Sequence, residues 1–190
     1  LLASRTRQQS ALARFSQEAL AGRDVPGLMQ LACECIADAM RVEYAKVLQL
    51  LPDGSGLLLQ AGVGWDAGLV GSAVVGTGPE SQAGYTLTSG GPVVVPDLAT
   101  ETRFRGQQLV LDHGTVSGMS VVIEGVDRGD PYGVLGIHAR TRREFSADDV
   151  EFVRAFAIAI TTAIVRARRE DEIEEARGRD RGAERAPGGP

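Results

Sequence analysis

The C-terminal part of the sequence constrains the fold most strongly, because it predicts one long helix with two apolar stripes. The first stripe recurs in alternating steps of three and four residues, and it comprises Val150, Val153, Ala157, Ile160 and Ile164. The second stripe comprises Phe152, Phe156, Ala159 and Ala163. Ser146 followed by Asp149 resembles a capping box at the start of this helix. One face can pack on a sheet while the other meets a partner helix, so the first stripe is expected in the interface of a parallel homodimer.

The rest of the pattern predicts helices that flank a mainly antiparallel sheet, which is an α+β fold. Residues 1–20 and 28–40 carry apolar side chains at helical spacing. Two hairpins are expected, because the apolar runs at 44–51 and 57–63, and those at 117–125 and 132–140, are each joined by a polar, Gly-containing turn. Between the hairpins the chain is rich in Gly and Ser. There we expect a short strand in "SAVV", a short helix in "ESQAGYTLTSG", an edge strand in "PVVVP" and one or two helical turns in "RGQQLVLDH".

Size and charge exclude several classes of function. A chain of 190 residues suits one domain with a full core. The net charge is −5 and Lys46 is the only lysine, which argues against a nucleic-acid-binding protein. No apolar run approaches the length of a membrane span and no secretory signal pattern opens the chain, so we expect no membrane contact and a cytoplasmic location. The first residue is Leu1 rather than methionine, which suggests a fragment of a longer protein.

The chain offers no recognisable catalytic or metal-binding motif. Cys33 and Cys35 stand two apart in a predicted helix, so their side chains diverge by about 200° around its axis and suit neither a disulfide nor a zinc site. Cys35 falls on the apolar stripe of that helix and is expected to be buried, whereas Cys33 falls off the stripe. No activated nucleophile, paired carboxylates or phosphate-binding loop stands out. We therefore predict no catalytic residue and no metal ligand.

Several segments together resemble a GAF domain. They are "VEYAKVLQLLPDG", "LLLQAGVGW", "GPVVVPDLATETRF", "DHGTVSGMSVVI" and "YGVLGIHARTRREFSADDVEFVRAFA". The resemblance spans residues 25–166 and implies a sheet of about six strands, with the N- and C-terminal helices bundled on one face and a loop-roofed ligand pocket on the other. It implies a sensory module without catalysis in a multi-domain bacterial signalling protein, such as a sensor histidine kinase of a two-component system.

The same resemblance implies the roles of the flanking segments. Residues 1–24 would form a signalling and dimerisation helix. Residues 167–190 would form a charged exit helix, joined to an output domain, with a disordered tail at 182–190. Signals in such an arrangement would leave through the terminal helices.

By position in the fold, the resemblance also implies which residues surround the pocket. They are Trp65, Tyr85, Phe104, His113, Ser117 and Met119. For Trp65, Phe104 and Met119, a plain core position is an equal alternative. His113 is expected to finish a turn or to donate a hydrogen bond at the pocket edge, and His138 to be a hydrogen-bonded strand residue. Asp97 is expected to cap a turn.

The identity of the ligand is not predicted, although some classes are disfavoured. Phytochrome-like GAF domains hold a bilin on a cysteine, and the corresponding stretch "TETRFRGQQLVL" has none. The Asn-Lys…Phe…Asp-Glu pattern of cyclic-nucleotide-binding GAF domains is missing. Free methionine-sulfoxide reductases of GAF fold need cysteines in the pocket, whereas both cysteines here lie on an early helix. Two alternatives stay open: a receptor for a defined cofactor such as haem, for which an isolated histidine is a weak signal, and a structural dimer scaffold without a ligand.

Overall fold

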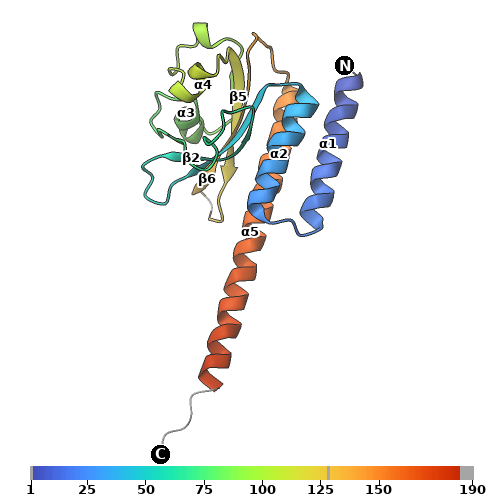
Figure 1. The fold of residues 1–190 in the computed structure, drawn as a ribbon, viewed down its shortest axis with the longest axis vertical. Helices are drawn as coiled ribbons and strands as arrows, with labels where there is room; N and C mark the ends of the chain where they lie inside the picture. The colour runs from blue at the N-terminus through green and yellow to red at the C-terminus, as the bar shows by residue number, and fades with distance from the viewer. Residues whose placement is uncertain (1, 128, 185–190) are drawn as a thin grey trace, which may run out of the picture.

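The protein is built on one six-stranded sheet, with long helices on one face and short helices and loops on the other (Figure 1). The computed structural model describes residues 2–127 and 129–184. The strand order is β3-β2-β1-β6-β5-β4, and every neighbouring pair is antiparallel. The strands are β1 (Tyr44–Leu50), β2 (Leu57–Val63), β3 (Val74–Val75), β4 (Val93–Val95), β5 (Ser117–Glu124) and β6 (Pro131–Ala139). The predicted α+β fold, both hairpins and the short edge strand β4 are confirmed.

Three long helices cover one face of the sheet. They are α1 (Leu2–Leu20), α2 (Val25–Met40) and α5 (Ala147–Glu184). The helices α2 and α5 lie against the sheet, and α1 lies outside them in contact with both (Figure 1). Phe15 of α1 is fully buried, with its ring centroid 4.8 Å from that of Phe156 on α5. The predicted bundle of N- and C-terminal helices on one face is therefore confirmed.

Short helices and loops cover the opposite face. They are α3 (Gln82–Ser89), a 3-10 turn at Leu98–Thr100 and α4 (Gln108–Asp112). Gly90 ends α3 in the left-handed conformation, with a φ of 71° that glycine adopts without strain. Asp97 caps the 3-10 turn, where its side chain accepts a hydrogen bond of 2.9 Å from the Ala99 amide. The predicted cap at Asp97 is confirmed.

Helix α2 is buried on two sides, because it lies between the sheet and α1. Cys35 is buried as expected, but Cys33 is fully buried too. The expectation that Cys33 lies off the apolar face is wrong, since it assumes one buried stripe on this helix: Cys33 lies against Val47 of β1, whereas Cys35 lies beside α1. Burial raises the pKa of both thiols above its ordinary value.

Helix α5 uses both of its apolar stripes inside the domain. Val153 and Ile160 are fully buried and Ala157 is 3% exposed, all within the core between the helices and the sheet. The second stripe packs on α1 through Phe156. The structure thus contradicts the expectation that Val153, Ala157 and Ile160 meet a partner helix, because their own domain already covers them. Val150 and Ile164 are only partly buried.

The start of α5 carries the predicted capping box, and its end leaves the domain. The Asp149 carboxylate accepts a hydrogen bond of 3.0 Å from the Ser146 amide, and the Ser146 hydroxyl accepts one of 3.2 Å from the Asp149 amide. Beyond Ile164 the helix extends away from the rest of the domain and is exposed on its own (Figure 1). Residues 182–184, which were predicted to belong to a disordered tail, are helical, and the rest of that predicted tail, 185–190, lies outside the described residues. No helix in the described ranges is both long and apolar enough to cross a membrane.

Candidate functional site

Strand alternation divides the sheet into an apolar face and a face with polar side chains. The apolar face of β1 and β6 packs into the helix-side core. On the loop-covered face, Tyr44 of β1 pairs with His138 of β6, and Lys46 pairs with Gly136. Ser120 of β5 pairs with Gly136 from the other side. Lys46, Ser120 and His138 therefore gather around a glycine at the centre of the sheet.

Lys46 is buried without an acidic partner. Its side chain is 3% exposed, and its ammonium nitrogen lies 5.2 Å from the centroid of the Trp65 ring. Among the described residues it forms no hydrogen bond and no ion pair. Burial lowers the pKa of Lys46 from 10.5 to about 7, because a buried ammonium loses its hydration. A lysine in this condition is rare in protein interiors.

His138 is also buried, and both of its ring nitrogens lack a hydrogen-bond partner in the described structure. The prediction that it is a hydrogen-bonded strand residue is therefore wrong. Gly118 leaves room for the imidazole, since a Cβ at that position would lie 2.5 Å from His138 Nδ1. Burial, and then the nearby charge of Lys46, hold the pKa of His138 well below its usual value. The neutral ring offers one donor and one acceptor.

A small cavity joins these two residues to α3 and α4. It has a volume of about 10 Å³ and is lined by Lys46, Gln82, Ala83, Gln107, Val110, Ser120, Val134 and His138. The other polar groups are paired: Gln82 Nε2 donates to Ser120 Oγ (3.1 Å), which lies 2.7 Å from Thr86 Oγ1. The Thr86 hydroxyl donates to the Gln82 carbonyl (2.7 Å). Within the described part of the chain, Lys46 and His138 are thus the polar groups of this cavity without a hydrogen bond or an ion pair, and Lys46 contacts only the face of the Trp65 ring.

A shallow groove of about 490 Å³ lies directly outside the cavity, between β3 and the start of α4. Gln107 lines both spaces. Its amide donates a hydrogen bond of 3.3 Å to the Gly76 carbonyl, which connects the two walls of the groove. Gln107 therefore lies at the boundary between the groove and the cavity that Lys46 and His138 line.

His113 holds the loops that cover this site. It ends α4, as predicted for a residue that finishes a turn. Its Nδ1 lies 2.8 Å from the Leu109 carbonyl, and its Nε2 lies 3.2 Å from the Asp66 amide. A carbonyl only accepts and an amide only donates, so these two contacts fit the tautomer with its proton on Nδ1. The Asp66 carboxylate lies 3.6 Å from Nε2.

The structure brings together only part of the predicted pocket. Trp65 lies at the site, with ring centroids 5.0 Å from His113 and 6.1 Å from His138, and its Nε1 donates to the Ala45 carbonyl. Tyr85 and Phe104 pack on each other at 5.5 Å in a separate cluster beside β4.

Ser117 and Met119 do not lie at the site. Met119 belongs to the helix-side core, and Ser117 shares its face of β5, with its hydroxyl donating to the Thr141 carbonyl. Their placement beside the pocket is contradicted, because the face of β5 that meets the loops carries Gly118 and Ser120 instead.

Sequence reasoning missed Lys46, Gln82, Ser120 and His138 as members of one site. A signal was present, because Lys46 is the only lysine of the chain and stands inside the strand "YAKVLQL". A charged residue within such a strand needs a reason to be buried.

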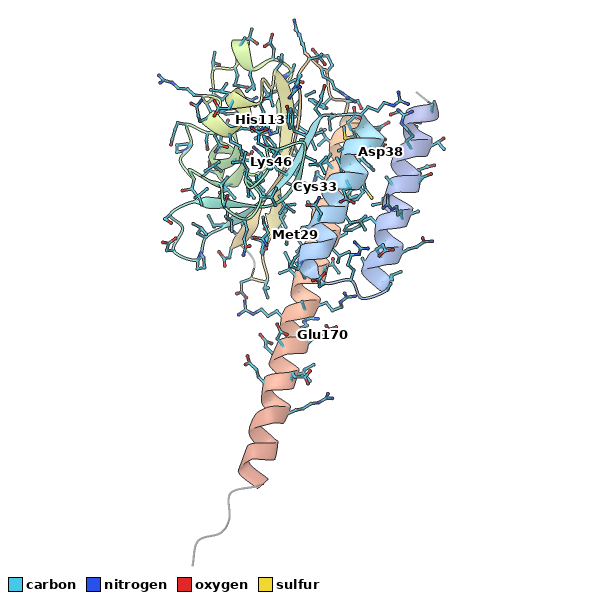
Figure 2. All side chains as sticks on the ribbon, in the orientation of Figure 1. Met29, Cys33, Asp38, Lys46, His113 and Glu170 are labelled. Atoms are coloured by element: carbon cyan, nitrogen blue, oxygen red, sulfur yellow. The ribbon has the colours of Figure 1, made fainter. Side chains whose placement is uncertain are left out.

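The thiols lie away from this site. Figure 2 shows Lys46 and His113 on the side of the sheet that carries the loops, and Cys33 on α2 on the other side. Within the described residues, no group of three or more His, Cys, Asp or Glu side chains is placed to hold a metal ion.

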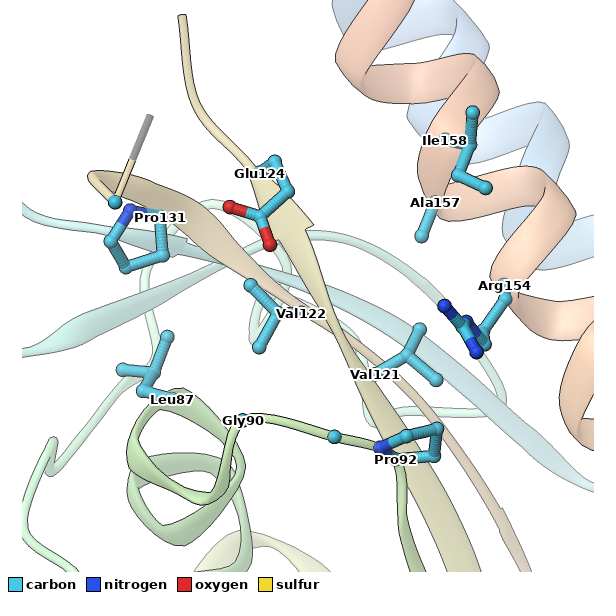
Figure 3. Close-up of a pocket in the computed structure, with 12 residues that line it drawn as sticks. Leu87, Gly90, Pro92, Val121, Val122, Glu124, Pro131, Arg154, Ala157 and Ile158 are labelled. Carbon is cyan, nitrogen blue, oxygen red and sulfur yellow. The ribbon is translucent and has the colours of Figure 1, made fainter. Parts of the chain in front are cut away.

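A second hollow, of about 360 Å³, lies where β5 extends past the short strand β4 (Figure 3). Leu87, Pro92 and Val122 face Arg154 and Ile158 of α5 across it. Arg154 already pairs with Glu151 at 3.1 Å. This hollow has no buried polar side chain left without a partner in the described part of the chain, so the Lys46–His138 site is the stronger candidate.

Comparisons with known proteins agree on one family. The family model of the GAF domain matches residues 24–164. The structure is similar to the GAF domain of an Acinetobacter phosphoenolpyruvate-protein phosphotransferase, with a TM-score of 0.72 and 20% identity over 87% of this chain and 97% of that one. It is also similar to the free methionine-R-sulfoxide reductase of Neisseria meningitidis in complex with its substrate (TM-score 0.73, 15% identity, 86% and 91% covered).

A segment of a methyl-accepting chemotaxis protein is similar as well (TM-score 0.67, 22% identity, 82% and 95% covered). No curated protein matches the sequence of this chain. At these identities the likeness to solved structures concerns the fold.

Proposed function

Because the chain belongs to the GAF domain family, we propose that it is a sensory module that binds a small molecule at the Lys46–His138 site and relays binding through α5. The observation that carries this proposal is the buried His138 imidazole, whose two nitrogens lack a hydrogen-bond partner in the described structure, beside the buried Lys46, whose ammonium has only the Trp65 ring as a partner. A buried polar group left unsatisfied costs about 1–3 kcal/mol. A ligand that forms hydrogen bonds with both Lys46 and His138 removes this cost, so it is bound in preference to a compound that cannot form them.

A structural scaffold without a ligand is the second candidate. The closed cavity of about 10 Å³ favours it, because that volume holds no more than about one water molecule. A scaffold, however, is better stabilised by apolar residues at Lys46 and His138, since replacing buried charged groups by apolar ones is often neutral or stabilising. The adjacent groove of about 490 Å³ supplies the room that the cavity lacks. These features favour the sensor.

Haem and catalysis fit the site poorly. Both ring nitrogens of His113 are engaged, and the ammonium of Lys46 beside His138 opposes a metal cation. The thiols of Cys33 and Cys35 have raised pKa values, which leaves them protonated and unreactive. We therefore expect a non-catalytic domain with no absorbance above the aromatic region after purification. A Soret band that is lost in His113→Ala would overturn this expectation.

The relay follows from the connection between the site and α5. His138 lies on β6 next to Ile137, which belongs to the helix-side core, and residues 140–146 lead from β6 into α5. A ligand shifts such a system only by binding its two states with different affinities. In a cytoplasmic bacterial signalling protein, such as a sensor histidine kinase, α5 would pass this change to an attached output domain.

We infer that two copies pair in parallel where α5 leaves the domain. Leu20, at the end of α1, is 85% exposed, and Ile173 of α5 is 52% exposed. The Arg166 guanidinium donates to the Ala19 carbonyl (3.1 Å), so the end of α1 lies beside the start of the exit segment. Pairing there would cover Leu20, Ile164 and Ile173, and it replaces the interface expected from Val153, Ala157 and Ile160.

Ligand screening with two readouts tests the proposed function. Thermal unfolding is measured with a panel of nucleotides, sugars, amino acids and organic acids, and hydrogen exchange is measured at residues 166–177. We expect at least one compound to raise the melting temperature, since a ligand at a hundred times its Kd adds about 2.7 kcal/mol of stability, and to change exchange in the exit segment. If no compound does either, the scaffold is the better account.

A further inference from the structure

The inner cavity is cationic. Lys46 and His138 are its only ionisable residues, and no Asp, Glu or Arg is among the described side chains that line it. The groups packed around them are uncharged: Trp65 from the loop after β2, Gln82 from α3, and Ser120 from β5. A cationic ligand would meet repulsion here, and no carboxylate among the described lining residues offsets it.

The two unpaired groups converge on one point. A Cβ on Gly136 would lie 3.4 Å from Lys46 Cε and 3.6 Å from His138 Nε2. The two side chains therefore approach each other over this glycine, from neighbouring strands. An ammonium and an imidazole N–H on side chains that lie next to each other are two donors for the two oxygens of a single group.

The number of charges limits the type of anion. Phosphate binding usually relies on arginine forks or several cations, whereas this cavity has one ammonium. An α-amino acid would also bring an ammonium group, and no described carboxylate lines the cavity to accept it. A plain monocarboxylate matches one cation and one neutral donor.

The outer groove indicates the rest of the ligand. Val74, Val75 and Leu109 contribute apolar surface to it, and Val74 is 55% exposed, while Glu80 and Arg105 bring one charge of each sign to its lining. The boundary to the cavity is Gln107, which is held by one hydrogen bond between neutral groups to Gly76. Displacing this side chain would let a head group reach Lys46 while an apolar body stays in the groove.

We propose that the site binds the carboxylate of a small, otherwise apolar organic monoanion, with its oxygens on Lys46 Nζ and the His138 N–H and its body in the groove between β3 and α4. This assignment rests on the proposed sensory function, which it makes specific. Binding needs a protonated Lys46, whose pKa without ligand is about 7. Affinity is therefore highest below pH 7 and weakens about tenfold per pH unit above it, because each binding event must then take up a proton.

Titration calorimetry of the whole chain with hexanoate tests the assignment. Hexanamide (the neutral isostere), leucine (a zwitterion) and inorganic phosphate serve as comparison ligands. The variants are Lys46→Met and, as a control with the same change of charge, Arg142→Met, whose exposed side chain lies outside both spaces. We expect hexanoate alone to bind, with about ten- to a hundredfold weaker binding in Lys46→Met, an unchanged affinity in Arg142→Met and weaker binding at pH 8.5 than at pH 6.5.

The other outcomes overturn the assignment in distinguishable ways. Equal binding of hexanoate to wild type and Lys46→Met, or equal binding of hexanamide, would show that Lys46 does not receive a carboxylate. If hexanoate fails while a nucleotide or sugar from the screen stabilises the protein and changes α5, the carboxylate assignment fails and the sensory function stands. If no compound acts in either experiment, both fail.

Discussion

Replacing Lys46 by methionine should stabilise the ligand-free protein, which is an unusual result for a buried position. Methionine is similar in length and removes the desolvated ammonium. The pKa of Lys46 falls from 10.5 to about 7 on folding. Each tenfold loss of proton affinity corresponds to about 1.4 kcal/mol, so the buried charge costs about 5 kcal/mol well below pH 7.

The sign of the pH dependence follows from the same values. Between pH 7 and 10.5 the unfolded chain keeps the proton that the folded protein releases, so the free energy of unfolding rises with pH. From pH 7 to 8.5 the gain is about 2 kcal/mol for wild type and absent in Lys46→Met. The depressed pKa of His138 acts at lower pH, where it favours the unfolded state as pH falls below 6.5.

Urea unfolding, followed by circular dichroism at pH 7 and pH 8.5, measures this effect. Lys46→Met should be more stable than wild type at pH 7, and the difference should shrink by about 2 kcal/mol at pH 8.5. Arg142→Met, which changes the charge equally at an exposed site, should follow wild type at both pH values. A wild type that is more stable than Lys46→Met at pH 7, or a difference that does not depend on pH, would refute the reasoning.

Three further predictions concern the sheet, the helix core and the relay. Gly118→Ala should destabilise the protein by about 1–3 kcal/mol, because its Cβ would lie 2.5 Å from His138 Nδ1 and 2.6 Å from the Ile137 carbonyl. As a control, Gly136→Ala, whose Cβ contacts are 3.4 Å or longer, should have a melting temperature near that of wild type. An equal loss of stability in the two variants would contradict this prediction. Ile160→Asp should unfold the domain by placing a charge in the core, whereas Ile158→Asp, at a 63% exposed position, should keep the melting temperature of wild type. An Ile160→Asp variant that is folded but monomeric would instead support the dimer interface predicted from the sequence. Inserting one residue after Arg166 turns the rest of α5 by about 100°. Insertions of one, two or three residues in the parent protein should therefore change the output, and an insertion of four residues should largely restore it. If none of the four insertions changes the output, a rigid helical relay is excluded.

Periodicity explains why most of the fold was predictable. The steps of three and four in α5 and the paired apolar runs around "PDGSG" and "VDRGDP" report local structure, and the helix and both strand pairs form where these patterns place them. The same information misassigned Val153, Ala157 and Ile160. Two stripes on a helix indicate two neighbours, but the spacing does not say whether the second neighbour is another molecule or, as here, α1.

The site was harder to predict, because its members come together only through tertiary structure. Alternation correctly put His138 on the same face as Val134, but it could not show that the imidazole nitrogens lack partners. Gln82 reaches Ser120 from a helix inside the Gly-rich region, where no periodic signal exists. Ser117 and Met119 were assigned by analogy to a pocket, although alternation with Ser120 places Met119 on the opposite face.

The protonation state of Lys46 tests the central claim most directly. Because Lys46 is the only lysine, a protein labelled with ¹³C-lysine gives one side-chain ε-carbon signal, and its titration reports the pKa of that amine alone. We predict a midpoint near pH 7 for the free protein and a clear upward shift on adding saturating hexanoate, because a bound carboxylate favours the charged form. A midpoint near the ordinary value of 10.5, unchanged by hexanoate, would show that Lys46 is hydrated or already paired and would contradict the account.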